Sequence, residues 1–181
     1  MQFGKRAGSM TGCRHTVHQI ELLDQLLTQN EAEDNPEIRR SLLAKAAVIG
    51  AYIKCRGNLM FIGERSSVTD TAELSACLEE SLANLELMSV ECAMDILGKN
   101  RIYTQDAIRV YDFFEAVTEA AMDDLRFVWL KARSLEDAIV FYLHAESKGD
   151  LSELSVLADT CTCEEGVWRF SLRIGKAGEP A

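Results

Sequence analysis

Two consecutive helical patterns near the start of the chain constrain its fold more than any other feature. Between residues 12 and 30, apolar residues recur at three- and four-residue spacing, so one face of this predicted helix must be covered. These positions are Val17, Ile20, Leu22, Leu23, Leu26 and Leu27. The segment ending in Asn35-Pro36 interrupts the pattern. Asn as a helix cap, followed by Pro at the first helical position, predicts a second helix over residues 36–62.

The second predicted helix is the longest in the chain. Its small residues allow a neighbouring helix to approach closely. These residues are Ala47, Gly50 and Ala51. Two antiparallel helices joined by a short turn form a hairpin that is too thin to bury both apolar faces. Pairing with the hairpin of a second copy would produce a four-helix bundle, so the sequence predicts a homodimer.

Charge and hydropathy exclude two classes of partner. The 181-residue chain has a net charge of −10, whereas nucleic acids are bound mainly by clustered Lys and Arg, so we expect no nucleic-acid partner. No apolar run approaches the roughly 18 residues of a membrane span, so we expect none in this chain. An apolar share of 48% is sufficient for a buried core.

The six cysteines are scattered among apolar residues, and no secretory signal precedes them. We therefore expect reduced thiols and a cytoplasmic protein. Only Cys161 and Cys163 form a close pair in the sequence. Because they have neither a second pair nor a nearby histidine, the spacing of a zinc site is missing, and no metal site is predicted.

The pattern changes to mixed helix and strand after a polar break at residues 63–69. Helices are predicted over 71–88 and 104–125 with a short one over 150–158, and strands over 90–97, 127–132, 138–144 and 167–174. This order predicts an α+β fold in which two helices cover one face of a small mixed sheet. We expect three regions: a flexible lead-in over 1–11, the helical hairpin over 12–63 and an α/β sandwich over 70–181.

Two histidines, His15 and His18, lie one turn apart at the edge of the first apolar stripe. A histidine there can stay in contact with solvent while packing fixes the helix. This suits an imidazole that accepts and gives up a phosphoryl group. The alternative is that both are ordinary polar residues where the polar face of the helix begins.

The stretch Arg14-His-Thr-Val-His-Gln19 resembles the histidine box of bacterial sensor histidine kinases. A helical hairpin followed by a small α/β sandwich also resembles the layout of that family. The resemblance implies a dimerisation and phosphotransfer hairpin, followed by a degenerate histidine-kinase-like ATP-binding domain over 70–181. His18 matches the accepting histidine best, and His15 is the second choice. Gln19 stands where the family usually has an acidic residue.

The resemblance extends to a nucleotide site, with departures. Glu119 matches the glutamate of the family's N box, which helps to place water, and Asp123 stands where an asparagine would hold magnesium on the phosphates. A carboxylate at that position adds negative charge beside a triphosphate. Of the glycine-rich adenine box, only Gly149 remains. The resemblance therefore implies ATP and Mg²⁺ as cofactors only if this site is functional, and the departures predict weak or no binding of Mg-ATP.

A chain that keeps the hairpin histidine and the sandwich but loses the nucleotide boxes resembles the sporulation-type phosphotransferases. This resemblance implies a two-component signalling protein, in which the hairpin histidine exchanges a phosphoryl group with an aspartate in the receiver domain of a response regulator. Two alternatives stay open. One is a non-catalytic adaptor dimer that docks a signalling partner, and the other is the cytosolic part of an active ATP-dependent histidine kinase.

Overall fold

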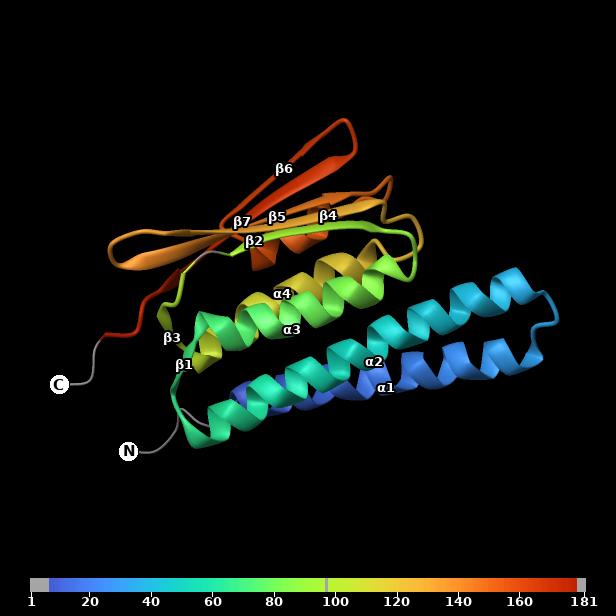
Figure 1. Ribbon diagram of the computed structural model, residues 1–181, viewed down its shortest axis with the longest axis horizontal. Helices are drawn as coiled ribbons and strands as arrows, with labels where there is room; N and C mark the ends of the chain where they lie inside the picture. Colours follow the sequence, from blue (N-terminus) through green and yellow to red (C-terminus); the bar gives the residue numbers. More distant parts are fainter. Residues whose placement is uncertain (1–6, 97, 179–181) are drawn as a thin grey trace.

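The computed structural model describes the backbone of residues 7–96 and 98–178, and the side chains of 16–96 and 98–178. Figure 1 shows three layers: the α1–α2 hairpin, then the α3–α4 helix pair, then a sheet. In chain order the elements are α1 (Ala7–Ala32), α2 (Pro36–Arg65), β1 (Val68–Asp70), α3 (Thr71–Glu86), β2 (Glu91–Ile96), β3 (Arg101–Tyr103), α4 (Thr104–Ala120), β4 (Phe127–Ser134), β5 (Ala138–Glu146), the 3₁₀ helix η1 (Ser152–Leu157), β6 (Thr160–Glu164) and β7 (Val167–Gly175).

The hairpin forms where the sequence predicted it, although α1 is longer than expected. It begins at Ala7, so residues 7–11, which were expected to belong to a flexible lead-in, are helical. The side chain of Asn35 accepts a hydrogen bond from the Glu37 amide at 2.9 Å, which confirms it as the cap of α2.

The helices of the middle layer also begin as predicted, but α4 ends early. The Asp70 side chain caps α3 by accepting from the Ala72 amide at 2.8 Å. The prediction that a helix continues to residue 125 is wrong, because α4 ends at Ala120 and the chain then turns. The Met122 amide bonds to the Glu119 carbonyl at 3.2 Å, a three-residue spacing typical of a turn. Asp123 therefore lies beyond the helix.

The sheet is mixed and has the strand order β2-β4-β5-β7-β6. Strand β2 is parallel to β4, and the other pairs are antiparallel. Figure 1 shows α3 and α4 together on one face of the sheet. The predicted α+β class is confirmed. The sequence did not predict edge strand β6 or the short pair of β1 and β3.

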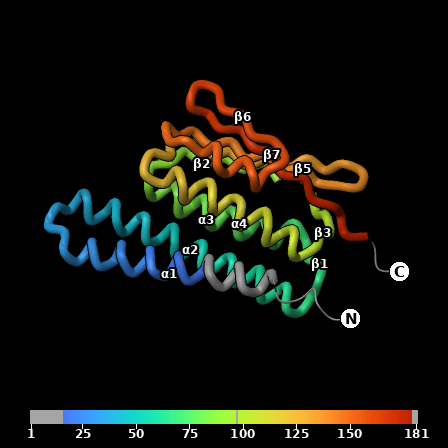
Figure 2. Tube along the Cα trace, turned by 180° about the vertical axis from the view of Figure 1, so that it is seen from behind, coloured from blue at the N-terminus to red at the C-terminus, as the bar shows by residue number. Residues whose placement is uncertain are grey.

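A single apolar core joins all three layers. It includes Tyr52 of α2, Phe114 of α4 and Phe170 of β7, all almost fully buried. The rings of Tyr52 and Phe114 meet edge to face, with centroids 6.0 Å apart. Figure 2 shows, from behind, that the hairpin lies along the α3–α4 pair. The inner face of the hairpin is thus covered by the chain's own sandwich.

No helix in the described part of the chain is long and apolar enough to cross a membrane.

Candidate functional site

A row of four carboxylates runs from the middle of α4 to the turn after it, on the side of the helix that contacts the hairpin. Asp112, Glu115 and Glu119 are three and four residues apart on α4, which places them on one helix face, and Asp123 continues the row in the turn after the helix. Each of the four contacts a side chain of the hairpin. We call these residues the carboxylate row.

His18 of α1 contacts the third member of this row. Its Nε2 lies 3.2 Å from Oε1 of Glu119, which is within hydrogen-bond distance. The His18 side chain is 64% exposed, while that of Glu119 is 20% exposed. The side chain therefore contacts a protein carboxylate through Nε2, and most of its surface is open to solvent. It is within reach of a large partner.

Gln19, the next residue along α1, points into the interface and is fully buried. Its Nε2 donates to Oε2 of Glu115 at 3.2 Å, and Glu115 is also fully buried. The Oε1 atom of Gln19 has no hydrogen-bond partner among the described side chains. Gln19 is therefore engaged by Glu115, and the carboxylate in contact with the His18 ring is that of Glu119.

Arg56 of α2 binds the first member of the row. Its Nε and Nη2 donate to the two carboxylate oxygens of Asp112 at 2.6 and 3.2 Å, and its side chain is only 5% exposed. Nη1 also lies 3.4 Å from Oγ1 of Thr16 on α1. One guanidinium therefore connects three helices close to His18. Lys54, by contrast, pairs with Glu80 of α3 at 2.7 Å.

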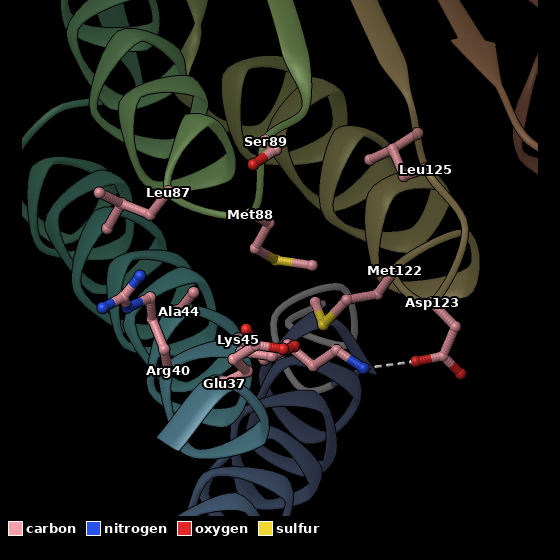
Figure 3. A pocket seen from close by; sticks show the side chains of 11 residues that line it. Glu37, Arg40, Ala44, Lys45, Leu87, Met88, Ser89, Met122, Asp123 and Leu125 are labelled. Atoms are coloured by element: carbon pink, nitrogen blue, oxygen red, sulfur yellow. Dashed lines mark hydrogen bonds and ion pairs between the residues drawn. The ribbon is translucent and has the colours of Figure 1, made fainter. Parts of the chain in front are cut away.

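The fourth member of the row borders a cavity between the hairpin and the sandwich. Lys45 of α2 donates to Asp123 at 2.6 Å, as the dashed line in Figure 3 shows. The cavity has a volume of about 310 Å³. Met88 and Met122 extend into the space between the helices, and Arg40 lies on the α2 side (Figure 3). Met122 is almost fully buried there.

The residues assigned to a nucleotide site are separated in the structure. Glu119 contacts His18, and Asp123 contacts Lys45. Asp123 lines the cavity of Figure 3, whereas Glu119 and Gly149 do not. Gly149 lies in a turn where its amide donates to the Ser147 hydroxyl at 3.0 Å and its carbonyl accepts from the Trp168 indole at 3.1 Å. A Cβ at position 149 would lie 3.2 Å from that hydroxyl, so glycine is explained by local packing. These residues do not fit a Mg-ATP site in this arrangement.

The neighbouring Asp124 has a structural role in the same turn. Its carboxylate accepts from the Ser147 hydroxyl at 2.6 Å and from the Lys148 amide at 2.7 Å. The Ser147 hydrogen bond, followed by the backbone amides, lowers the pKa of this carboxyl group. Asp124 therefore holds the turn that contains Gly149.

The sequence predicted His18 as the phosphoryl acceptor, and it assigned Glu119, which contacts His18 in the structure, to a nucleotide site. The two residues are 101 positions apart, so no local pattern links them. The spacing of Asp112, Glu115 and Glu119 along α4 was the available signal, because it places three carboxylates on one helix face. The side chain of His15, the second candidate, lies outside the described residues.

Comparisons with known proteins agree on the fold. The sequence matches no family model and none of the curated proteins. Among solved structures, a bacterial phosphotransferase superposes with a TM-score of 0.53 at 10% identity, over 94% of this chain and 98% of that one. The histidine kinase domain of a blue-light activated histidine kinase from Erythrobacter litoralis superposes with a TM-score of 0.52 at 12% identity, over 86% of this chain and 95% of that one. The resemblance to histidine kinases is thus confirmed as a likeness of fold.

Proposed function

We propose that this chain, which has the histidine-kinase fold of a hairpin followed by an α/β sandwich, is a two-component phosphotransfer protein. His18 would carry the phosphoryl group and exchange it with an aspartate in the receiver domain of a response regulator. The observation that carries the proposal is the position of His18. Its ring is 64% exposed on the first hairpin helix, and one of its nitrogens is already held by a carboxylate.

The chemistry asked of His18 is nucleophilic substitution at phosphorus. A lone pair on the imidazole attacks the phosphorus of an aspartyl phosphate, a P–N bond forms, and the P–O bond breaks to release the aspartate carboxylate. The reverse step recharges a second receiver domain. Such a step needs an exposed ring that a large partner can approach, together with a group that manages the ring proton. His18 and its surroundings supply both.

The contacts of Glu119 and Asp123 favour a receiver domain over ATP as the phosphoryl donor. Glu119 and Asp123, the residues that would serve the nucleotide, are engaged by His18 and Lys45 of the hairpin. A metal-bound triphosphate would have to displace both contacts. The ATP-dependent kinase alternative is therefore less favoured than phosphoryl exchange between proteins.

We further propose that the protein is a homodimer. Large apolar side chains are exposed along the hairpin, even though the sandwich covers its inner face. They include Val17, Ile20 and Leu27 on α1, and Ile38, Leu43 and Phe61 on α2. Burial of such a surface against a second hairpin is favourable, and it would complete a four-helix bundle.

The test is transfer of a labelled phosphoryl group. Receiver domains from the source genome are charged with acetyl phosphate, mixed with the full chain, and acid-labile label is followed on wild type, His15→Gln and His18→Gln. We expect label on wild type and His15→Gln, and none on His18→Gln. Label lost only in His15→Gln would move the site by one turn. Label on no variant with any receiver would contradict the proposal and favour the adaptor alternative.

A further inference from the structure

The cavity of Figure 3 has no part in the chemistry proposed for His18, and both layers build it. It has a volume of about 310 Å³, at the lower end of the range for small-molecule sites. Arg40 and Ala44 line it from α2, whereas Met88 and Met122 come from the turns that follow α3 and α4. A molecule bound in this cavity would therefore contact the hairpin and the sandwich together.

Four of the lining residues give the cavity an apolar floor: Ala44, Met88, Met122 and Leu125. Ala44, Met122 and Leu125 are almost fully buried, and both methionines extend into the space between the helices in Figure 3. None of these side chains forms a strong hydrogen bond with water, so a hydrocarbon group that displaces water from them is favoured. Methionine is flexible and adapts to ligands of different shape. The floor therefore fits a short apolar chain.

Two opposite charges lie about one helical turn apart on the α2 side of the cavity. Glu37 and Arg40 both line it, and they are three positions apart on the same helix. Among the described residues, neither side chain has a hydrogen-bond or ion-pair partner. The other two charges of the cavity are paired with each other, because Lys45 donates to Asp123 at 2.6 Å. One carboxylate and one guanidinium are thus left for a ligand that carries both a cation and an anion.

We propose that this cavity binds an α-amino acid with an apolar side chain. The ligand carboxylate accepts from the Arg40 guanidinium, its ammonium group donates to Glu37, and its side chain lies against Met88 and Met122. These contacts give each free charge an opposite partner and cover the apolar floor. The inference does not depend on phosphoryl transfer by His18.

The turn between α3 and β2 has an uncommon backbone where it lines the cavity. Ser89 has a φ of 64°, in the left-handed region that residues other than glycine seldom adopt. Its amide donates to the Glu86 carbonyl at 2.9 Å, so the turn is closed by a hydrogen bond of its own. Residues in such conformations are concentrated at ligand clamps and other functional sites. The strained turn is the one that brings Met88 to the cavity.

The test uses the full chain with ¹³C-methyl-labelled methionine, and L-leucine as the probe. NMR follows the methyl signals of Met88 and Met122, which are assigned by substitution. Three analogues of leucine each lack one element: 4-methylpentanoate lacks the ammonium group, 3-methylbutylamine lacks the carboxylate, and alanine has only a methyl side chain. The variants are Glu37→Gln and Arg40→Gln. Arg39→Gln is the matched control, because Arg39 is an exposed neighbour that does not line the cavity. Circular dichroism verifies that each variant is folded.

We expect leucine to shift the Met88 and Met122 signals saturably, with a dissociation constant of about 1 mM or tighter, which a ligand of this size can reach. Each analogue should bind at least about fivefold more weakly, since it loses one charge-assisted contact or most of its apolar contact. Arg40→Gln should weaken the binding of leucine by a similar factor but leave that of 3-methylbutylamine unchanged, because this analogue has no carboxylate. Glu37→Gln should likewise weaken leucine and not 4-methylpentanoate. Arg39→Gln should bind leucine as wild type does.

Three results with leucine would overturn the inference. They are the absence of saturable shifts, analogues that bind as tightly as leucine, and an equal loss of affinity in Arg39→Gln and Arg40→Gln. Shifts of Met88 and Met122 that a receiver domain causes and leucine does not would assign the cavity to a protein partner, and would overturn the inference as well.

Discussion

At the scale of single residues, the interface between hairpin and sandwich depends on polar groups that are buried and paired. Arg56 is the clearest case, with its guanidinium almost fully buried against Asp112. A buried charge is tolerated when its hydrogen bonds are made, and it becomes costly when its partner is lost. Loss of one partner would leave the other charge without its hydrogen bonds.

Replacing Arg56 with methionine should therefore destabilise the fold. The Asp112 carboxylate would lose two hydrogen bonds, and because it keeps part of its exposure we expect a loss at the lower end of the range for buried pairs, about 3 kcal/mol in the free energy of unfolding. Urea denaturation measures this loss. Lys54→Met is the control, since Lys54 is solvent-exposed and its pair with Glu80 should matter little. Equal effects of the two substitutions would contradict this account of Arg56.

His144 on β5 should make stability depend on pH. Burial and, secondarily, the charge of Arg169 lower its pKa below the ordinary value of 6.5. The unfolded chain then binds this proton more readily than the folded one, so stability falls as the pH decreases below about 6.5, until the folded pKa is reached. Wild type should lose stability relative to His144→Gln between pH 7 and pH 5. A difference that stays constant over that range would show that His144 does not contribute.

The structural role of a residue could be predicted from the sequence where the interaction that defines it is local. Asn35 and Asp70 cap their helices through amides two residues away, so a short pattern contains all the information. The contact of His18 with Glu119 depends on how α1 and α4 pack, and no spacing in the sequence encodes that distance. The same holds for Gln19, whose burial is decided by its partner Glu115 on α4.

At the scale of elements, the strong periodic patterns gave the four long helices and four of the strands. The end of α4 was missed because apolar residues continue through Ala121, Met122 and Leu125, which are buried although the chain has left the helix. Strand β6 was missed because its sequence Thr-Cys-Thr-Cys-Glu is short and only partly apolar, and its pairing with β7 supplies most of its order.

The outward face of the hairpin should bind a second copy of this chain. Ile20 is half exposed in the middle of α1, so a charge there would be buried in the proposed four-helix bundle. Analytical ultracentrifugation at micromolar concentration should find wild type as a dimer and Ile20→Glu as a monomer. Val156→Glu, on the exposed 3₁₀ helix, should remain dimeric. A monomeric wild type would remove the dimer from this account.

At the scale of the whole molecule, the hairpin and the sandwich form one packed unit. The residues of the sandwich that would serve a nucleotide are instead in contact with the hairpin. This follows from the carboxylate row, in which Glu119 meets His18 and Asp123 meets Lys45. The chain has a fold similar to that of histidine kinases, while one surface of its α/β layer contacts His18 and Lys45 of the hairpin.

Titration calorimetry with Mg-ATP tests this use of the sandwich. We expect no measurable heat at micromolar protein, because binding would have to break the His18–Glu119 and Lys45–Asp123 contacts and would place a triphosphate beside unpaired carboxylates. Lys45→Ala frees Asp123 and should not create binding. A dissociation constant for Mg-ATP in the micromolar range or below would contradict this account and favour the ATP-dependent kinase alternative.

The most direct test of the central claim compares two phosphoryl donors in one experiment. Wild type and His18→Gln are each incubated with γ-labelled Mg-ATP alone, and separately with a labelled, phosphorylated receiver domain, and acid-labile label on the chain is measured. The account predicts label on wild type from the receiver and not from ATP, and no label on His18→Gln from either donor. Label from ATP on wild type, or label from the receiver that survives His18→Gln, would contradict it.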